Sequence, residues 1–67
     1  MITLKPLWGY LAYHNISIAE LSRRSGVATI TLHNMKKNNT FTGSVLDKIC
    51  TTLNINISQI MRYENTL

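Results

Sequence analysis

A single glycine, Gly26, interrupts a helical pattern at residues 23–35 (RRSGVATITLHNM) and constrains the fold more than any other feature. Before it, SIAE at residues 17–20 is a capping-box signal, which predicts a helix from residue 18 to about 25. Glycine directly after such a helix favours a left-handed C-terminal residue. A second helix is predicted from residue 29 to about 36. Two short helices joined by so tight a turn must pack at a steep angle.

The N-terminal part of the chain has the apolar spacing of an amphipathic helix. The apolar stripe consists of Leu4, Leu7, Trp8, Leu11 and Ala12. Pro6 is tolerable in the first turn of this helix, and Asn15 breaks it. The polar segment KKNNT ends the helix that follows Gly26, because Asn38 or Asn39 can adopt a positive φ.

The C-terminal part predicts two more helices. The segment TGSVLDKICTTL (42–53) carries one apolar face, and Thr42 or Ser44 could cap it. NISQ at residues 56–59 is a second capping-box signal and opens a last helix through Ile57, Ile60 and Met61. Strand signals are weak, since LNINIS alternates only briefly. The predicted fold is all-α: five short helices in one domain over residues 1–67, with a helix-turn-helix motif at about 18–37.

Within the motif, four apolar residues are expected to hold the two helices together, which leaves one face of the second helix exposed. The inward set is Leu21, Val27, Leu32 and Met35. The exposed set on the second helix is Thr29, Ile30, His33, Asn34 and Lys37.

No charged residue occurs between Ala28 and Met35, although an exposed helix normally carries Glu and Lys. The hydroxyls of Thr29 and Thr31 can bond a phosphate or a base, and Ile30 can pack on thymine methyl groups. His33 and Asn34 can bond base edges or phosphate. Lys36, Lys37, Asn38 and Asn39 stand at the helix end, where phosphates would be met.

Each of these residues also has an ordinary structural interpretation. Ile30 could belong to the core, and His33 could be a solvated histidine. Lys36 and Lys37 could be favourable charges at a helix C-terminus, as could the arginines at residues 23–24. Only the spacing of the whole set favours DNA.

The charge balance supports a polyanionic partner. Seven Lys and Arg against three Asp and Glu give a net charge of +4 on 67 residues. Nucleic acid is the first expectation and an anionic membrane surface the second. No apolar run approaches the roughly 18 residues of a membrane span, and no secretory signal is recognisable. The expected location is the cytoplasm, with the nucleoid when the protein is bound to DNA.

Catalysis, metal binding and a cofactor find little support in the sequence. Cys50 is the only cysteine, and its flanking apolar residues predict a buried structural thiol rather than a nucleophile. His14, His33 and Cys50 are too scattered for a zinc site. The three acids stand in separate helical contexts. We therefore expect no enzyme activity, no metal, no cofactor and no small-molecule ligand.

Three segments resemble the small lambda-repressor-like, Cro/Xre-type helix-turn-helix transcriptional regulators of bacteria and their phages and mobile elements. They are KPLW (5–8), AELSRRSGVATITLHNM (19–35) and VLDKICTTLNINISQIM (45–61). The resemblance implies a five-helix domain whose third helix lies in the major groove. The base-reading residues that it implies are Thr29, Ile30 and His33. The phosphate contacts that it implies are Ser17, the backbone of Ile18, Thr31, Asn34, Lys36, Lys37, Asn38 and Asn39.

The sequence departs from the family pattern at three places. Ala28 stands where the family favours a Ser or Thr cap, which costs about 1 kcal/mol unless Thr29 takes over as cap. Ser22 replaces a small Ala and is tolerable if its hydroxyl bonds a backbone carbonyl. The loop after the third helix has no arginine, so minor-groove reading is not expected.

Two functions remain in competition. The first is a DNA-binding transcriptional regulator, expected to be a repressor, that binds a two-fold site as a homodimer. Its dimer surface would be the last helix or the tail MRYENTL. The second is a protein-interaction module of the same fold, an antitoxin-like protein or a partner of another regulator, with weak DNA binding. RNA binding is a variant of the first, but the aromatic residues form no stacking platform.

Overall fold

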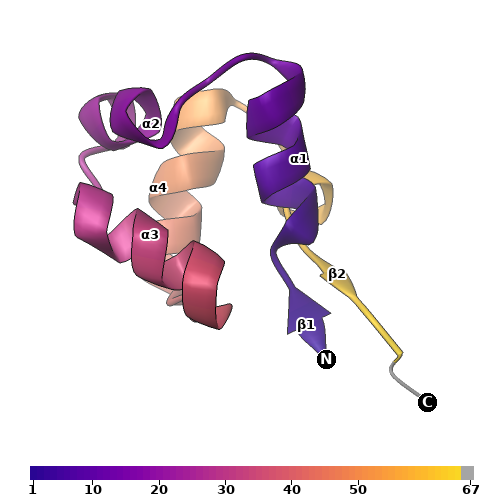
Figure 1. Cartoon of the computed structure of the whole chain (residues 1–67). Helices are drawn as coiled ribbons and strands as arrows, with labels where there is room; N and C mark the ends of the chain where they lie inside the picture. Colours follow the sequence, from indigo (N-terminus) through magenta and orange to yellow (C-terminus); the bar gives the residue numbers. More distant parts are fainter. Residues whose placement is uncertain (66–67) are drawn as a thin grey trace.

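The short stretches of helical pattern form four α-helices in the computed structural model, which describes residues 1–65 (Figure 1). The helices are α1 (Lys5–Tyr13), α2 (Ile18–Ser25), α3 (Thr29–Asn38) and α4 (Gly43–Leu53). A 3-10 turn, η1 (Ile57–Gln59), and two short strands, β1 (Ile2–Thr3) and β2 (Arg62–Tyr63), complete the described part. No helix within residues 1–65 is long and apolar enough to cross a bilayer.

Left-handed residues end the helices. Gly26 closes α2 with φ of 79°, as predicted. Asn39 closes α3 with φ of 55°, which decides between the two asparagines considered for this position. Asn54 closes α4 in the same conformation, and Asn15 follows α1 at φ of 59°. The short polar side chain of asparagine makes this conformation tolerable where glycine is absent.

Hydroxyl side chains begin α2 and α4. The Oγ of Ser17 accepts a hydrogen bond from the Glu20 N–H at 3.0 Å, so half of the predicted capping box is present. The carboxylate of Glu20 contacts Arg24, one turn along α2, at 3.5 Å instead of reaching back to the helix start. The Oγ1 of Thr42 accepts from the Val45 N–H at 3.3 Å, so Thr42 and not Ser44 caps α4.

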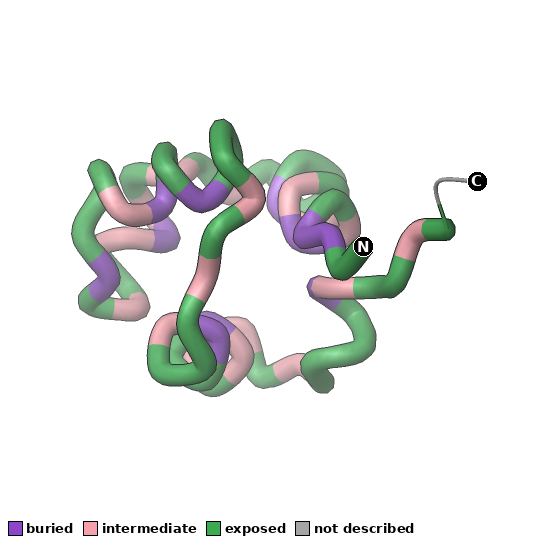
Figure 2. Tube along the Cα trace, turned by 90° about the horizontal axis from the view of Figure 1, so that it is seen from below, coloured by how far each residue is buried: buried purple, intermediate pink, exposed green. Residues whose placement is uncertain are grey.

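The core lies where α1, α2, α3 and α4 meet, and the buried positions of each helix face this interior (Figure 2). Its buried residues are Leu4, Leu7, Leu11, Leu21, Val27, Leu32, Met35, Leu46, Ile49 and Ile60. Most of them are leucine or isoleucine at helical spacing, which is why the sequence pattern located four of the helices correctly. Cys50 is half-buried at the margin of this core rather than fully buried as predicted.

The predicted fifth helix is wrong. The NISQ capping box forms, because Asn56 and Gln59 bond each other reciprocally, but the turn that it opens ends at residue 59. Ile60 is fully buried, and the chain then becomes extended at Arg62. Strand pairing with the N-terminus competes with the helix here, and its partner lies 60 residues away, beyond the reach of any local pattern.

The two strands form an antiparallel ribbon that brings the described ends of the chain together (Figure 1). Ile2 is opposite Tyr63, and Thr3 is opposite Arg62. Met1 and Glu64 extend the pairing through two backbone hydrogen bonds. The Glu64 carboxylate also binds the side chains of Lys5 at 3.2 Å and Arg62 at 3.1 Å. This ribbon is the part of the fold that the sequence analysis missed.

Asn39 joins the end of α3 to the ribbon. Its Nδ2 donates to the carbonyl of Ile2 at 2.7 Å, and its Oδ1 accepts from the N–H of Leu4 at 3.1 Å. One side chain therefore satisfies a strand carbonyl and the backbone N–H that precedes α1. The end of α3 and the start of the chain are thereby fixed to each other.

Substitution of Gly26 tests the left-handed turn. Nothing lies within 4 Å of a Cβ placed there, so Gly26→Ala meets no clash and only the cost of the positive φ remains. We expect Gly26→Ala to lower the free energy of unfolding by about 1–2 kcal/mol, measured by urea denaturation. Gly26→Asn should lose less, because asparagine accepts this conformation at positions 39 and 54. Equal losses for the two variants would contradict this explanation.

Stability should depend on pH through Glu64. Hydrogen bonds from Lys5 and then Arg62 hold the pKa of Glu64 below its usual range. A lowered pKa in the folded chain stabilises it above the ordinary glutamate pKa of about 4.3, and this contribution disappears as pH falls through the lowered value. The melting temperature of Glu64→Gln should therefore lie below that of the unmodified chain at pH 7, with the difference narrowing in acid. The control is Asp47→Asn, which removes a carboxylate without an ion pair among the described residues and should change the melting temperature at pH 7 less than Glu64→Gln does.

Candidate nucleic-acid interface

The turn between α2 and α3 is held by packing and by one hydrogen bond. Leu21, Val27, Leu32 and Met35 are all buried, as predicted for the inward side of the motif. The Oγ of Ser22 donates to the carbonyl of Val27 at 2.6 Å, which is the bond that makes serine acceptable at this position. Since the turn is fixed on both sides, the direction of α3 relative to α2 is fixed as well.

The outer face of α3 carries the three predicted base-reading residues. Thr29, Ile30 and His33 are exposed, and 67% of the Ile30 surface is accessible, so the alternative that Ile30 belongs to the core is wrong. Within the described part of the chain, the side chains of Thr29 and His33 form no hydrogen bond or ion pair. Their polar groups are therefore available to another molecule.

The helical repeat sets the order of the side chains around α3, at about 100° per residue. The order around the axis is Lys36, Thr29, His33, Lys37, Ile30, Asn34, Asn38 and Thr31. The predicted base-reading residues thus form a ridge along the middle of the exposed face, and the predicted phosphate contacts stand mainly at its two borders. We call this set of Thr29, Ile30 and His33 the α3 ridge.

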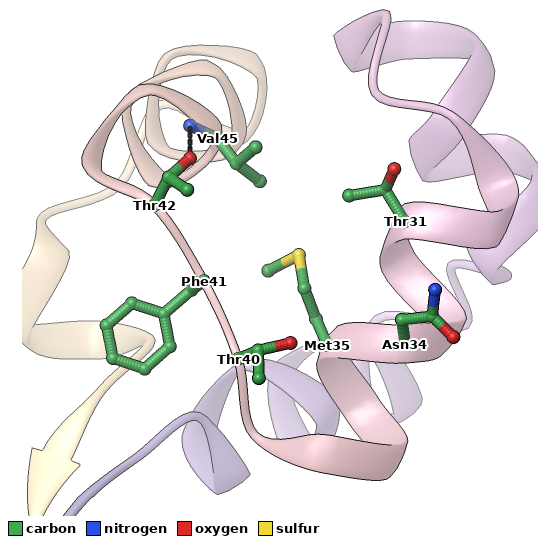
Figure 3. Close-up of a pocket in the computed structure, with 7 residues that line it drawn as sticks. All are labelled: Thr31, Asn34, Met35, Thr40, Phe41, Thr42 and Val45. Atoms are coloured by element: carbon green, nitrogen blue, oxygen red, sulfur yellow. Dashed lines mark hydrogen bonds between the residues drawn. The ribbon is translucent and has the colours of Figure 1, made fainter.

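A shallow groove of about 290 Å³ lies along one border, between α3, the following loop and the start of α4 (Figure 3). Its lining residues are Thr31, Asn34, Met35, Thr40, Phe41, Thr42 and Val45. Thr31 and Asn34 were predicted to contact phosphate. The loop residues of this groove were not identified as contacts from the sequence, although the run TFT at residues 40–42, a few residues after the predicted helix, is a hydroxyl-rich signal that could have found them.

A second groove, of about 240 Å³, lies where α1, the α1–α2 connection and α3 meet. Ser17 and Lys36 both line it, so the structure brings together two predicted phosphate contacts that are 19 positions apart in the sequence. The Ser17 hydroxyl already accepts the Glu20 N–H, but its own hydrogen remains free to donate. Lys37 and Asn38 are exposed in the last turn of α3, outside both grooves.

The start of α3 lacks a side-chain cap. Ala28 occupies the N-cap with φ of −60° and ψ of 142°, and Thr29 is the first helical residue, so Thr29 does not replace the missing cap. The backbone N–H groups of the first turn therefore receive no side-chain acceptor. Thr29, the first residue of the α3 ridge, lies in this same turn.

Charges near α3 are positive. Lys36 and Lys37 lie in its last turn, and Arg23 and Arg24 end α2. Arg24 is paired with Glu20, whereas Arg23 forms no ion pair with any described residue. No acidic residue occurs on α3, so its surface attracts anions.

Chemistry of another kind is not indicated by the geometry. Burial raises the pKa of the Cys50 thiol, and the nearby charge of Asp47 raises it further, which keeps the thiol protonated at neutral pH. Among residues 1–65, no three His, Cys, Asp or Glu side chains come together as metal ligands would. Cys50 therefore acts as an apolar residue at the margin of the core.

A tight turn, an exposed polar helix and a basic border together define a helix-turn-helix DNA-binding domain. Comparison with protein families agrees, because the model of the Cro/C1-type helix-turn-helix DNA-binding domain matches residues 6–66. The chain belongs to this family. No curated protein and no solved structure matches it. The predicted resemblance is thus confirmed, and with it DNA as the partner.

The uncapped start of α3 generates a prediction for stability. Ala28 already has the extended conformation of an N-cap, so Ala28→Thr should supply the missing acceptor and raise the free energy of unfolding by about 1 kcal/mol. Ala28→Val is the matched control, because valine has the shape of threonine without the hydroxyl. If the two variants unfold at the same urea concentration, the first turn of α3 does not need a side-chain acceptor.

Proposed function

We propose that the protein binds double-stranded DNA in a sequence-specific manner, with α3 lying in the major groove. The observation that carries this proposal is the α3 ridge, an exposed and uncharged row of side chains on a helix that is otherwise fixed in direction. Thr29 and His33 can bond base edges there, and Ile30 can pack on thymine methyl groups. A wide major groove accepts an α-helix of this size.

The two borders of the ridge are the proposed phosphate contacts. Thr31 and Asn34 line the groove between α3 and the start of α4. Ser17 and Lys36 line the groove where α1, the α1–α2 connection and α3 meet. A helix that enters the major groove has a DNA strand on each side, so contacts at both borders would set its register. Lys37 and Asn38 would add contacts at the end of α3.

The biological role that fits best is transcription regulation, with repression as the specific proposal. A single domain of this size makes few contacts, so specific binding favours two copies on half-sites about one helical turn apart. The protein would act in the cytoplasm, associated with the nucleoid when bound. Two-fold symmetry of the protein would then appear as two-fold symmetry in the binding site.

One observation favours the alternative of a protein-interaction module. Ile30 is a large apolar residue with two thirds of its surface exposed, as expected where another protein docks. However, its neighbours on α3 are polar, and a single exposed isoleucine is no apolar patch. The two functions differ in their dependence on salt, because only DNA binding releases many counterions.

Fluorescence anisotropy with labelled duplexes, from 50 to 200 mM salt, tests the proposal. After a binding site has been selected from random sequence, Thr29→Ala and His33→Ala should each relax preference at one base position by about 1–3 kcal/mol. Lys37→Ala should weaken binding to all sequences alike and reduce the slope of log K against log salt by about 0.9. The control Lys48→Ala removes the same charge from α4, outside the motif, and should change the slope much less.

Two results would contradict the proposal in different ways. Equal losses on every sequence for the variants of Thr29, His33 and Lys37 would show that the ridge does not read bases. Binding that is absent or independent of salt, with the protein folded, would favour the protein-interaction module instead.

A further inference from the structure

Trp8 is the only tryptophan of the chain, and it belongs to two parts of the structure. Its half-buried side chain packs against the core, as expected from its place in the apolar stripe of α1. It also lines the groove of about 240 Å³ in which Ser17 and Lys36 meet. Trp8 therefore joins the core to a groove that holds two of the proposed phosphate contacts. We call this groove the Trp8 groove.

The indole N–H of Trp8 has no acceptor within the described part of the chain. An indole nitrogen can only donate a hydrogen bond, and it usually has an acceptor when it is buried. Trp8 forms no hydrogen bond with residues 1–65, yet no side-chain nitrogen or oxygen in this range is both buried and without a partner. The indole nitrogen is therefore in contact with solvent and available as a donor. A leucine at this position would complete the apolar stripe without supplying this donor.

Other groups that line the Trp8 groove can also donate. The Ser17 hydroxyl still has its hydrogen to donate, and the ammonium group of Lys36 forms no ion pair with a described residue. Ile18 is the first residue of α2, so its backbone N–H has no partner inside the helix. No acidic side chain lines the groove. A group that carries negative charge and several acceptor oxygens, such as a phosphate, is complementary to these donors.

The setting of the indole favours a contact that orients its partner. A hydrogen bond to an ionised acceptor is stronger than one between neutral groups, and apolar surroundings strengthen it further. Leu11, Ala12 and Ile16 provide such surroundings in the wall of the groove. Because the Trp8 ring is packed against the core, it loses little conformational freedom when its N–H binds an acceptor.

We propose that Trp8, Ser17 and Lys36 bind one phosphate group of the DNA backbone, and that the indole N–H of Trp8 is the donor that orients it. Lys36 supplies the charge, but its long side chain can meet a phosphate in many positions. Trp8 supplies the direction, because its ring is held by the core. The contact comes from α1, outside the helix-turn-helix motif, so it fixes α1 against one DNA strand while α3 lies in the major groove.

This inference deepens the proposed function and rests on it, because the phosphate belongs to the duplex that α3 enters. It needs only one copy of the chain on one half-site. It therefore does not depend on the candidate dimer surface in the tail MRYENTL, whose last two residues lie outside the described residues.

The single tryptophan provides a direct measurement on the unmodified chain, since a nitrogen–proton correlation spectrum contains one indole signal. Titration with a mixed-sequence duplex at low salt should shift this signal downfield, as its N–H enters a hydrogen bond with a phosphate. Exchange of the same proton with water should become slower. A purely structural role of Trp8 would leave the signal where it is in the free protein.

Trp8→Phe keeps an aromatic ring against the core and removes the donor. Its affinity for duplex DNA, measured by fluorescence anisotropy, should fall about threefold to tenfold on selected and mixed sequences alike. The slope of log K against log salt should stay the same because no charge is lost, whereas Lys36→Gln should reduce it by about 0.9. The matched control is Tyr13→Phe, which removes a hydroxyl from an exposed position of the same helix, outside the Trp8 groove, and should bind normally.

Circular dichroism melts establish which variants are folded, and the indole signal of the unmodified chain decides the matter if Trp8→Phe does not fold. An indole signal that stays unchanged in the DNA-bound protein would overturn the contact and leave the proposed function standing. A folded Trp8→Phe that binds duplex DNA as tightly as the unmodified chain would do the same. A folded chain that binds no duplex would overturn the proposed function and the contact together.

Discussion

The turn between α2 and α3 is the constraint on which the rest of the structure depends. Gly26 adopts a left-handed backbone conformation that most other residues adopt only at a cost. The Ser22 hydroxyl holds the next part of the turn by donating a hydrogen bond to the carbonyl of Val27. With direction fixed, Leu32 and Met35 must face the core, and by helical periodicity the α3 ridge must face outward. The outer face of α3 is therefore kept exposed to solvent, which makes it the candidate DNA-binding surface of this small domain.

The exposed ridge also explains an apparent weakness at the start of α3. Ala28 leaves the backbone N–H groups of the first turn without a side-chain acceptor. The polar side chains of Thr29 and His33, which follow, form no hydrogen bond with any described residue of the chain. In the free protein, water satisfies them. In the proposed complex, DNA replaces that water and the hydrogen bonds are exchanged rather than created. We therefore expect the affinity to depend on phosphate charges and the α3 ridge to determine the preference among sequences.

Local pattern was sufficient for most of the fold and for the outer face of α3. Capping signals at Ser17 and Thr42 and the glycine at position 26 are readable within a few residues, so α2, α3 and α4 were located nearly to the residue. The ribbon was missed because its strands are two residues long and 60 positions apart. The second groove was also invisible, since Ser17 and Lys36 meet only after α1 and α3 have packed.

Asn39 gives the domain a property that none of its helices has alone. Its left-handed backbone ends α3, while its side chain bonds the Ile2 carbonyl and the Leu4 amide. Fraying of the last turn of α3 therefore releases the N-terminal strand, and loss of that strand loosens the helix end. We therefore expect opening at these two sites, 35 positions apart between Leu4 and Asn39, to be coupled, so that the exchange rate of the Leu4 amide proton reports on the end of α3 as well as on the N-terminal strand.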